Sequence, residues 1–169
     1  EERAKKRGVN IYGYIKGVGF SSDGYHYARY SPNCESFEYA IKECLNAAGW
    51  SKKEIDYICL DAEATTIGDY LETQALKNVF GKELDHISLS APKSMYGNLL
   101  GAQTALDLIT TLFSMNNNLV LPTVNYEMKD PYCDLDYTPN KAINRKIKKA
   151  LIIARGRGGI NTVLAVEGE

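Results

Sequence analysis

Hydrophobic positions along this chain repeat with two spacings, one typical of strands and one typical of amphipathic helices. Apolar residues at helical spacing predict three helices, whose apolar stripes run through Phe37–Ala48, Leu71–Phe80 and Leu99–Phe113. Short apolar or β-branched runs predict strands at residues 9–20, 55–60, 86–90, 119–125, 150–154 and 162–166. Because strands alternate with helices, we expect an α/β protein with a largely parallel sheet and an antiparallel pair at its end.

Capping residues predict where several of these elements begin and end. Gly49 follows the first helical stripe and is expected to stop that helix. Ser51 and Glu54 have the spacing of a capping box, and Asp69 with Glu72 repeats it, which predicts Asp69 as the cap of the second helix. No repeat or linker interrupts the pattern, so residues 1–169 are expected to form a single domain.

Composition narrows the classes of protein and partner. The chain has 20 Lys and Arg against 21 Asp and Glu, a balance that gives no reason to expect a nucleic acid partner. No run approaches the roughly 20 apolar residues of a membrane span, and EERAKKRG has no apolar secretory core. The expected location is therefore cytoplasmic. The four cysteines lack metal-ligand spacing, so we expect free thiols, no metal and no cofactor.

Several polar residues at predicted strand ends allow two interpretations each. Asp61, Glu63 and Asp69 follow the strand at 55–60 and are either acid/base groups or a solvated carboxylate and a helix cap. Lys93 is either a charge that holds an anion or a solvated loop lysine. The segment Gly156–Gly159 joins two strands and does not open a helix, which favours a tight turn over a phosphate-binding loop.

The segments SSDGYH, GDYLETQALKNVFG, KSMYGNLLGAQTA, LPTVNYEMKDPYCDLDYTPN and GRGGIN follow one another in an order that spans nearly the whole chain. In that order they resemble the C-terminal half of β-ketoacyl-ACP synthases, which belong to the thiolase-like condensing-enzyme superfamily. The resemblance implies the C-terminal half of a thiolase-like fold, with a five-stranded mixed sheet and helices packed on it. It also implies a central helix layer shared with an N-terminal half.

The resemblance implies a site that has lost its catalytic residues. Family members catalyse decarboxylative Claisen condensation with a cysteine from the N-terminal half and two histidines from the C-terminal half. Aligned motifs place Asp61 and Asn98 at the two histidine positions, while the family's lysine and glutamate are retained as Lys93 and Glu72. A carboxylate at Asp61 repels a developing oxyanion, whereas a histidine would donate a hydrogen bond to it.

The same resemblance implies an altered substrate tunnel. The family's NSFGFGGTN becomes IARGRGGIN, so Arg155 and Arg157 replace two aromatic residues, the second of which is a gate. The remaining tunnel or gate positions are Ala28, Gly156, Gly158 and Gly159. Because a buried guanidinium needs partners, we expect at least one arginine to form an ion pair with Asp61 or Glu63.

These substitutions together resemble the chain-length factor, the ketosynthase-β subunit of type II polyketide systems. The resemblance implies a catalytically silent homologue that pairs with a ketosynthase-α or with its own N-terminal half, and that meets acyl carrier protein but neither nucleic acid nor membrane. Two alternatives stay open: an active condensing enzyme that uses Asp61, Lys93 and Asn98, and a scaffold that binds acyl carrier protein without chemistry. Half of a two-lobed fold is also expected to expose an apolar surface.

Overall fold

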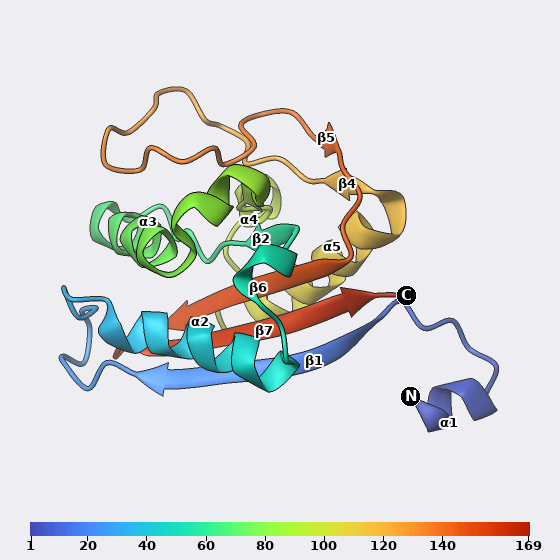
Figure 1. The fold of residues 1–169 in the computed structure, drawn as a ribbon. Coiled ribbons are helices and arrows are strands. Elements are labelled where there is room, and N and C mark those ends of the chain that lie inside the picture. Colours follow the sequence, from blue (N-terminus) through green and yellow to red (C-terminus); the bar gives the residue numbers. More distant parts are fainter.

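A computed structural model describes residues 1–169, and Figure 1 shows its arrangement of helices around one main sheet. Short 3₁₀ turns occupy Lys52–Glu54, Gly81–His86 and Leu100–Ala102. The helices and strands in chain order are α1 (Glu2–Lys6), β1 (Gly13–Ser22), α2 (Glu35–Ala48), β2 (Tyr57–Cys59), α3 (Thr66–Phe80), β3 (Ser88–Ser90), α4 (Lys93–Tyr96), α5 (Gln103–Asn117), β4 (Leu119–Val120), β5 (Ile143–Asn144), β6 (Lys149–Gly156) and β7 (Ile160–Gly168).

The main sheet is mixed and has five strands in the order β1-β7-β6-β2-β3. Strand β2 runs parallel to β3 and β6, whereas β7 runs antiparallel to β6 and β1. The five-stranded mixed sheet implied by the resemblance is therefore confirmed. The sheet is less parallel than the alternation of elements predicts, because the β6–β7 hairpin and β1 add two antiparallel pairings.

Helices cover both faces of this sheet. Helices α2 and α3 lie on one face and α5 lies on the other, behind the strands in Figure 1. Along β6, Leu151 and Ile153 point to the larger core under α2 and α3, while Ala150 and Ile152 point to a smaller core under α5. Successive side chains of a strand alternate between faces, so these strands are apolar throughout.

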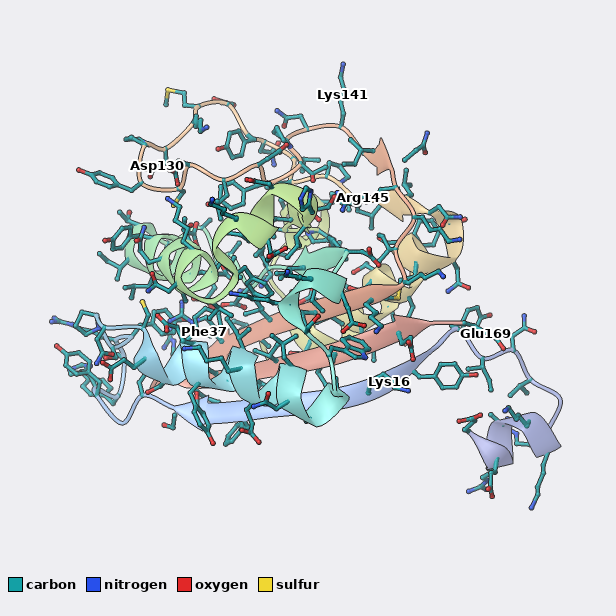
Figure 2. The ribbon with its side chains drawn as sticks, viewed as in Figure 1. Lys16, Phe37, Asp130, Lys141, Arg145 and Glu169 are labelled. Carbon is teal, nitrogen blue, oxygen red and sulfur yellow. The ribbon has the colours of Figure 1, made fainter.

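Helix α2 packs unusually close to the edge strand β1. Phe37 and Ile41 are buried beneath the helix, and Figure 2 shows Phe37 between α2 and the sheet. Strand β1 presents Gly17 and Gly19 to this helix, and a Cβ added at Gly19 would lie 1.8 Å from the Ala40 carbonyl oxygen. Helix α2 ends at Gly49, which adopts φ +69°, as the sequence predicts.

Several predicted boundaries differ from the structure, and two of the differences have a clear physical reason. Helix α3 begins at Thr66 with Thr65 as its N-cap, so the prediction that Asp69 caps this helix is wrong. The strand predicted at 119–125 forms only over Leu119–Val120, and Thr123 adds an isolated bridge to Pro139. Pro122 has no N–H to donate to a ladder, and the chain from 121 to 142 runs as a long loop above α3 and α4 (Figure 1). The capping box at Ser51 and Glu54 is confirmed.

The cysteines and the helix lengths bear on the remaining general predictions. Cys34, Cys44 and Cys59 are buried, Cys133 is partly buried, and all four are free thiols, as predicted. No three His, Cys, Asp or Glu side chains are grouped so that they could hold a metal ion. None of the helices combines the length and the apolar character that crossing a membrane requires.

Candidate functional site

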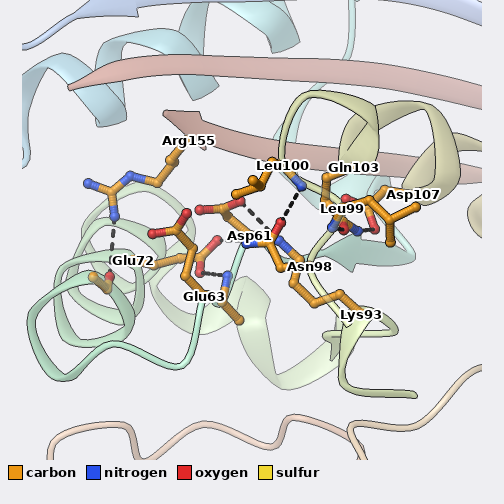
Figure 3. Close-up of polar contacts among 12 residues, drawn as sticks. Asp61, Glu63, Glu72, Lys93, Asn98, Leu99, Leu100, Gln103, Asp107 and Arg155 are labelled. Atoms are coloured by element: carbon orange, nitrogen blue, oxygen red, sulfur yellow. Dashed lines mark hydrogen bonds and ion pairs between the residues drawn. The ribbon is translucent and has the colours of Figure 1, made fainter. Parts of the chain in front are cut away.

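A buried ion pair lies at the carboxyl ends of two adjacent parallel strands. Asp61 follows β2 and Lys93 follows β3, so the parallel pairing brings them to the same edge of the sheet. Lys93 Nζ donates to Asp61 Oδ1 at 3.1 Å, and the two residues are only 5% and 6% exposed (Figure 3). Lys93 is therefore not the solvated loop lysine that the sequence alone also allowed.

Glu72 closes this strand end from helix α3. Its two carboxylate oxygens accept the backbone N–H groups of Asp61 at 2.9 Å and Ala62 at 2.8 Å. Burial, and then the charge of Asp61, raise the pKa of Glu72 to about 7, while Arg155 and the two backbone bonds act in the opposite direction. Glu72 thus fixes the backbone that carries Asp61.

The same buried environment shifts the pKa of Asp61. Burial raises the pKa of Asp61, and the adjacent Lys93 ammonium opposes that rise through its charge and its hydrogen bond. A buried ammonium and a buried carboxylate each need the other, because either charge alone in this environment is strongly disfavoured. Because Lys93 is paired with Asp61, its charge is not free to bind an incoming anion.

Asn98 lies near this pair on the surface of a cavity of about 460 Å³. Its side-chain Oδ1 accepts the N–H of Leu100 at 2.9 Å, and its amide nitrogen donates to no protein group (Figure 3). Leu100 holds a left-handed backbone with φ 53° at this turn. Lys93, Glu72, Asp69 and Glu63 line the same cavity, so the structure brings five of the sequence-selected residues to one site.

The acidic residue Glu63 stands between this cavity and a second cleft. It lines both the 460 Å³ cavity and a cleft of about 570 Å³ on the other side of the segment Glu63–Gly68. Its Oε2 accepts the Tyr30 hydroxyl at 3.0 Å. Glu63 is partly buried and hydrogen-bonded, so neither a freely solvated carboxylate nor a free base describes it.

Arg155 is buried at 8% exposure, and its predicted ion pair is wrong. No carboxylate lies within 4.0 Å of either arginine, and Asp61 pairs with Lys93. The Arg155 guanidinium donates to Asn161 Oδ1 and to the Gly68 carbonyl, both at 3.2 Å. It also lies 3.9 Å from the ring centre of Tyr30 and 4.6 Å from that of Phe37. Carbonyl oxygens and aromatic faces therefore supply the partners of this charge, and no carboxylate is among them.

Three of the other predicted tunnel positions line the second cleft. Arg157 is exposed and lines this cleft together with Ala28 and Gly158. Gly158 and Gly159 form the β6–β7 turn with φ +81° and +75°, and a Cβ at Gly159 would lie 2.4 Å from that of Asp23. This tight turn confirms the interpretation favoured by the sequence. Gly156 has open space, since an added Cβ would meet only Ile160 at 3.7 Å.

Tyr30 is the residue of this site that sequence reasoning missed. It connects Glu63 through its hydroxyl and Arg155 through its ring. Nothing in the local pattern singles it out, because it lies in an irregular loop that contains two other tyrosines, Tyr25 and Tyr27. Its role depends on where that loop folds against β6, and no residue spacing encodes that placement.

Comparison with known proteins gives this geometry a family context. The profile described as β-ketoacyl synthase, C-terminal domain, matches residues 12–127. "Nodulation protein E" of Rhizobium sp. (strain N33) is 41% identical over 164 residues, covering 97% of this chain and 40% of that relative. "3-oxoacyl-[acyl-carrier-protein] synthase 2" of Coxiella burnetii (strain RSA 493 / Nine Mile phase I) is 38% identical, covering 98% of this chain and 40% of that relative. The chain thus spans about two fifths of the length of these curated relatives.

Two solved structures share the fold across the chain. The first is described as a type II PKS acyl-carrier protein in complex with its ketosynthase bound to the hexaketide, with TM-score 0.95 and 32% identity. The second is the ishigamide ketosynthase/chain length factor, with TM-score 0.92 and 30% identity. Each match covers 99% of this chain and 41% of the solved chain.

Proposed function

This chain belongs to the β-ketoacyl synthase family, whose C-terminal domain it matches, and from that premise we propose that it is a catalytically silent ketosynthase homologue resembling a chain-length factor. It acts in polyketide or fatty-acid biosynthesis by pairing with an active ketosynthase. Residues 1–169 form one domain of that protein. The similarity to the ishigamide ketosynthase/chain length factor supports this assignment.

The observation that carries the proposal is the buried Asp61–Lys93 pair. A condensing enzyme needs neutral donors where negative charge develops on the thioester oxygen, and the loss of one such donor costs about 10²–10³ in rate. Asp61 offers a paired carboxylate at the family's first histidine position, and Asn98 offers an amide at the second. The proposal that this chain lacks condensing activity therefore depends more on the charge at Asp61 than on the absence of histidine.

The partner of this chain is proposed from its uncovered apolar surface. Ile109 and Phe113 project outward from α5 with 62% and 50% of their surface exposed, and Val18 and Phe20 are exposed on β1. The chain spans about two fifths of its relatives' length, so a larger N-terminal portion is available in this family to cover that face. We take its occupant to be that portion, in the same polypeptide or supplied with a ketosynthase-α subunit.

Acyl carrier protein is the proposed macromolecular partner, and the cytoplasm the proposed compartment. One similar structure is described as an acyl-carrier protein in complex with its ketosynthase, which supports this partner. Neither a metal nor an organic cofactor is part of the proposal. The arginine-lined cleft and the positions Ala28, Gly156, Gly158 and Gly159 are proposed as remnants of the substrate tunnel.

A decarboxylation assay tests the silence of the site. The chain is co-produced with the N-terminal half of a β-ketoacyl synthase, incubated with radiolabelled malonyl carrier protein and an acyl primer, and assayed for CO₂ release. We expect release no greater than without protein. An Asp61→Asn variant, which removes the negative charge at matched size, serves as the comparison. Release by the unaltered protein above that background would overturn the proposal, and its loss in Asp61→Asn would assign the activity to this site.

The alternative is an active 3-oxoacyl-ACP synthase that works with Asp61, Lys93 and Asn98. The 38% identity to the Coxiella burnetii 3-oxoacyl-ACP synthase 2 favours this reading. Under it, Asn98 donates its free amide to the substrate carbonyl, so Asn98→Ala abolishes CO₂ release while Asn98→His preserves it. Under the silent reading neither variant changes a rate that is already at background. The same assay therefore separates the two functions.

A further inference from the structure

The loop between β4 and β5, residues 121–142, crosses above α3 and α4 and forms part of the wall of the 460 Å³ cavity (Figure 1). Tyr126, Met128 and Cys133 of this loop line the cavity, and Leu76 of α3 lines it as well. Because one loop supplies this part of the wall, a movement of that loop would change access to the cavity without any change in the sheet.

The two ends of this loop are hydrogen-bonded to each other and form a fixed neck. Thr123 donates its N–H to the Thr138 carbonyl at 3.0 Å, and its own carbonyl accepts the Asn140 N–H at 2.8 Å. The side chain of Asn140 accepts the Tyr126 N–H at 3.0 Å and donates to the Tyr126 carbonyl at 2.7 Å. Thr138 Oγ1 also donates to the Leu89 carbonyl of β3 at 2.9 Å, so the neck is attached to the sheet.

The outer part of the loop, residues 127–134, which we call the tip, has no backbone hydrogen bond to any other part of the protein. The Cys133 N–H donates to the Asp130 carbonyl, and the Tyr132 N–H donates to the Asp130 carboxylate, so both bonds stay within the tip. Figure 2 shows Asp130 on this part of the loop. A segment with so few backbone contacts to its surroundings opens at a free energy well below that of global unfolding.

Two side chains of α3 hold the tip against the helix. Lys77 forms an ion pair with Asp134, and Tyr70 meets Tyr132 edge-on, with ring centres 6.1 Å apart. Tyr70 and Lys77 are seven residues apart, so they lie on the same side of α3, two turns from each other. The Lys77 and Asp134 side chains are 34% and 47% exposed. An ion pair this exposed is weak, so these contacts hold the tip reversibly.

The residues that follow the tip are held more firmly. Leu135 and Tyr137 pack against the larger core, and the Tyr137 hydroxyl lies 2.8 Å from Thr73 Oγ1. The contacts of the loop thus change at residue 135, from exposed side-chain contacts to core packing. An opening movement therefore involves the tip and leaves the neck and the core in place.

We propose that the tip is a lid over the 460 Å³ cavity, and that the Lys77–Asp134 and Tyr70–Tyr132 contacts are the latch that keeps it closed. When the lid opens, the cavity that Asn98 lines becomes accessible from the side of α3. This inference does not depend on the proposed function, because a lid controls access to the cavity whether or not the chain has condensing activity.

Cys133 reports lid opening without any engineered label, because it lies in the tip, lines the cavity and is partly buried, whereas the other three cysteines are buried. Its reaction with the neutral reagent iodoacetamide is followed by mass spectrometry. We expect Lys77→Met to raise the rate about two- to fivefold. Loss of a positive charge disfavours a thiolate, so a change in thiol reactivity alone would slow the reaction. Raising the salt concentration from about 0.02 to about 0.5 M should speed the unaltered chain but not Lys77→Met, since salt screens the ion pair.

A second latch variant and a buried thiol make the result decisive. Tyr70→Ala removes the aromatic contact from the α3 side and should also speed the reaction of Cys133, whereas Tyr39→Ala, on the exposed side of α2, should not. Cys44 is completely buried and reports global unfolding, so it must stay unreactive in each variant. Equal gains at Cys133 and Cys44 would contradict the lid, because the whole fold would then be opening. Unchanged Cys133 rates in both Lys77→Met and Tyr70→Ala would overturn the proposal.

Discussion

The single carboxyl group of Glu72 links the site to the stability of the whole protein. Its ordinary pKa is 4.5, and burial raises the pKa to about 7 in the folded state. Between these values the unfolded chain has released the proton while the folded chain keeps it. Folding stability attributable to Glu72 is therefore complete below pH 4.5, falls as the pH rises to about 7, and is constant above that.

We predict that Glu72→Gln flattens the pH dependence of unfolding between pH 5 and 7. Urea unfolding at pH 5, 6, 7 and 8 measures the free energy of unfolding for both proteins. Burial also raises the pKa of Asp69 and Asp107, but these groups remain in both proteins and their contributions largely cancel in the difference. The difference includes the interaction between Glu72 and the charge of Asp61. Parallel curves for the two proteins would show that Glu72 is ionised throughout.

The Arg155 guanidinium is predicted to stabilise the fold, whereas Arg157 is not. Arg155→Met removes two hydrogen bonds and two aromatic contacts from a buried position and should lower the free energy of unfolding by about 2–3 kcal/mol. Arg157→Met is the matched control, since this side chain is exposed, and should change it by no more than about 0.5 kcal/mol. Equal effects in urea unfolding at neutral pH would contradict the assigned contacts.

The partners of Arg155 could not be predicted from the sequence, although the need for partners could. Sequence reasoning placed a guanidinium in an apolar context and correctly required partners for it. It chose carboxylates, although the Gly68 carbonyl and the Tyr30 and Phe37 rings serve the same need. Those partners come from α2, α3 and a loop far apart in sequence, so only their folded positions decide among chemically equivalent choices.

At the scale of elements, the approach of α2 to β1 depends on glycine. We predict that Gly19→Ala destabilises the protein by about 1–3 kcal/mol, because the new methyl group would lie 1.8 Å from the Ala40 carbonyl oxygen and α2 would have to shift away from the strand. Gly156→Ala provides the control, as its Cβ meets only Ile160 at 3.7 Å. Thermal unfolding compares the two, and similar midpoints would mean that α2 shifts freely on the strand.

Element prediction succeeded where local spacing and packing agree. Helix α2 and the β6–β7 hairpin were predicted because their apolar residues are both regularly spaced and buried. It failed at Asp69, since the chain already turns into α3 at Thr66, before the residue with capping chemistry. Helix α5 covers most of its predicted range and extends to Asn117. The predicted stripe at Ile109 and Phe113 is exposed, whereas Leu108, Leu112 and Met115 pack on the small core, and residue spacing does not tell these two sides apart.

At the scale of the whole molecule, the spacing of hydrophobic residues did not predict the order of the strands in the sheet. Apolar runs predicted strands near the right places, but β1, first in sequence, pairs with β7, last in sequence. That pairing joins strands separated by more than a hundred residues, and no local sequence pattern indicates it. The resemblance to condensing enzymes supplied the mixed five-stranded sheet, and it also brought Asp61, Asn98 and Lys93 into one site before any geometry was considered.

The exposed apolar face leads to a prediction about the behaviour of the chain in solution. Gly17 and Gly19 face α2, so strand alternation puts Val18 and Phe20 on the opposite side of the sheet, the side on which α5 lies. With Ile109 and Phe113 they make an apolar region that we expect to exceed the roughly 300–600 Å² typical of monomers. The chain alone should therefore self-associate as its concentration rises and should bind a dye specific for apolar surfaces.

Charged substitutions on this face should reverse both properties without unfolding the protein. Ile109→Lys with Phe113→Glu places opposite charges on exposed positions of one helix at i and i+4, so helix α5 should be retained. We expect light scattering to report a monomer for this variant and dye binding to fall several-fold. Tyr39→Lys, equally exposed but on α2, should leave association unchanged. If the unaltered chain is itself monomeric at high concentration and binds no dye, the face needs no partner, and the pairing proposed for it loses its physical basis.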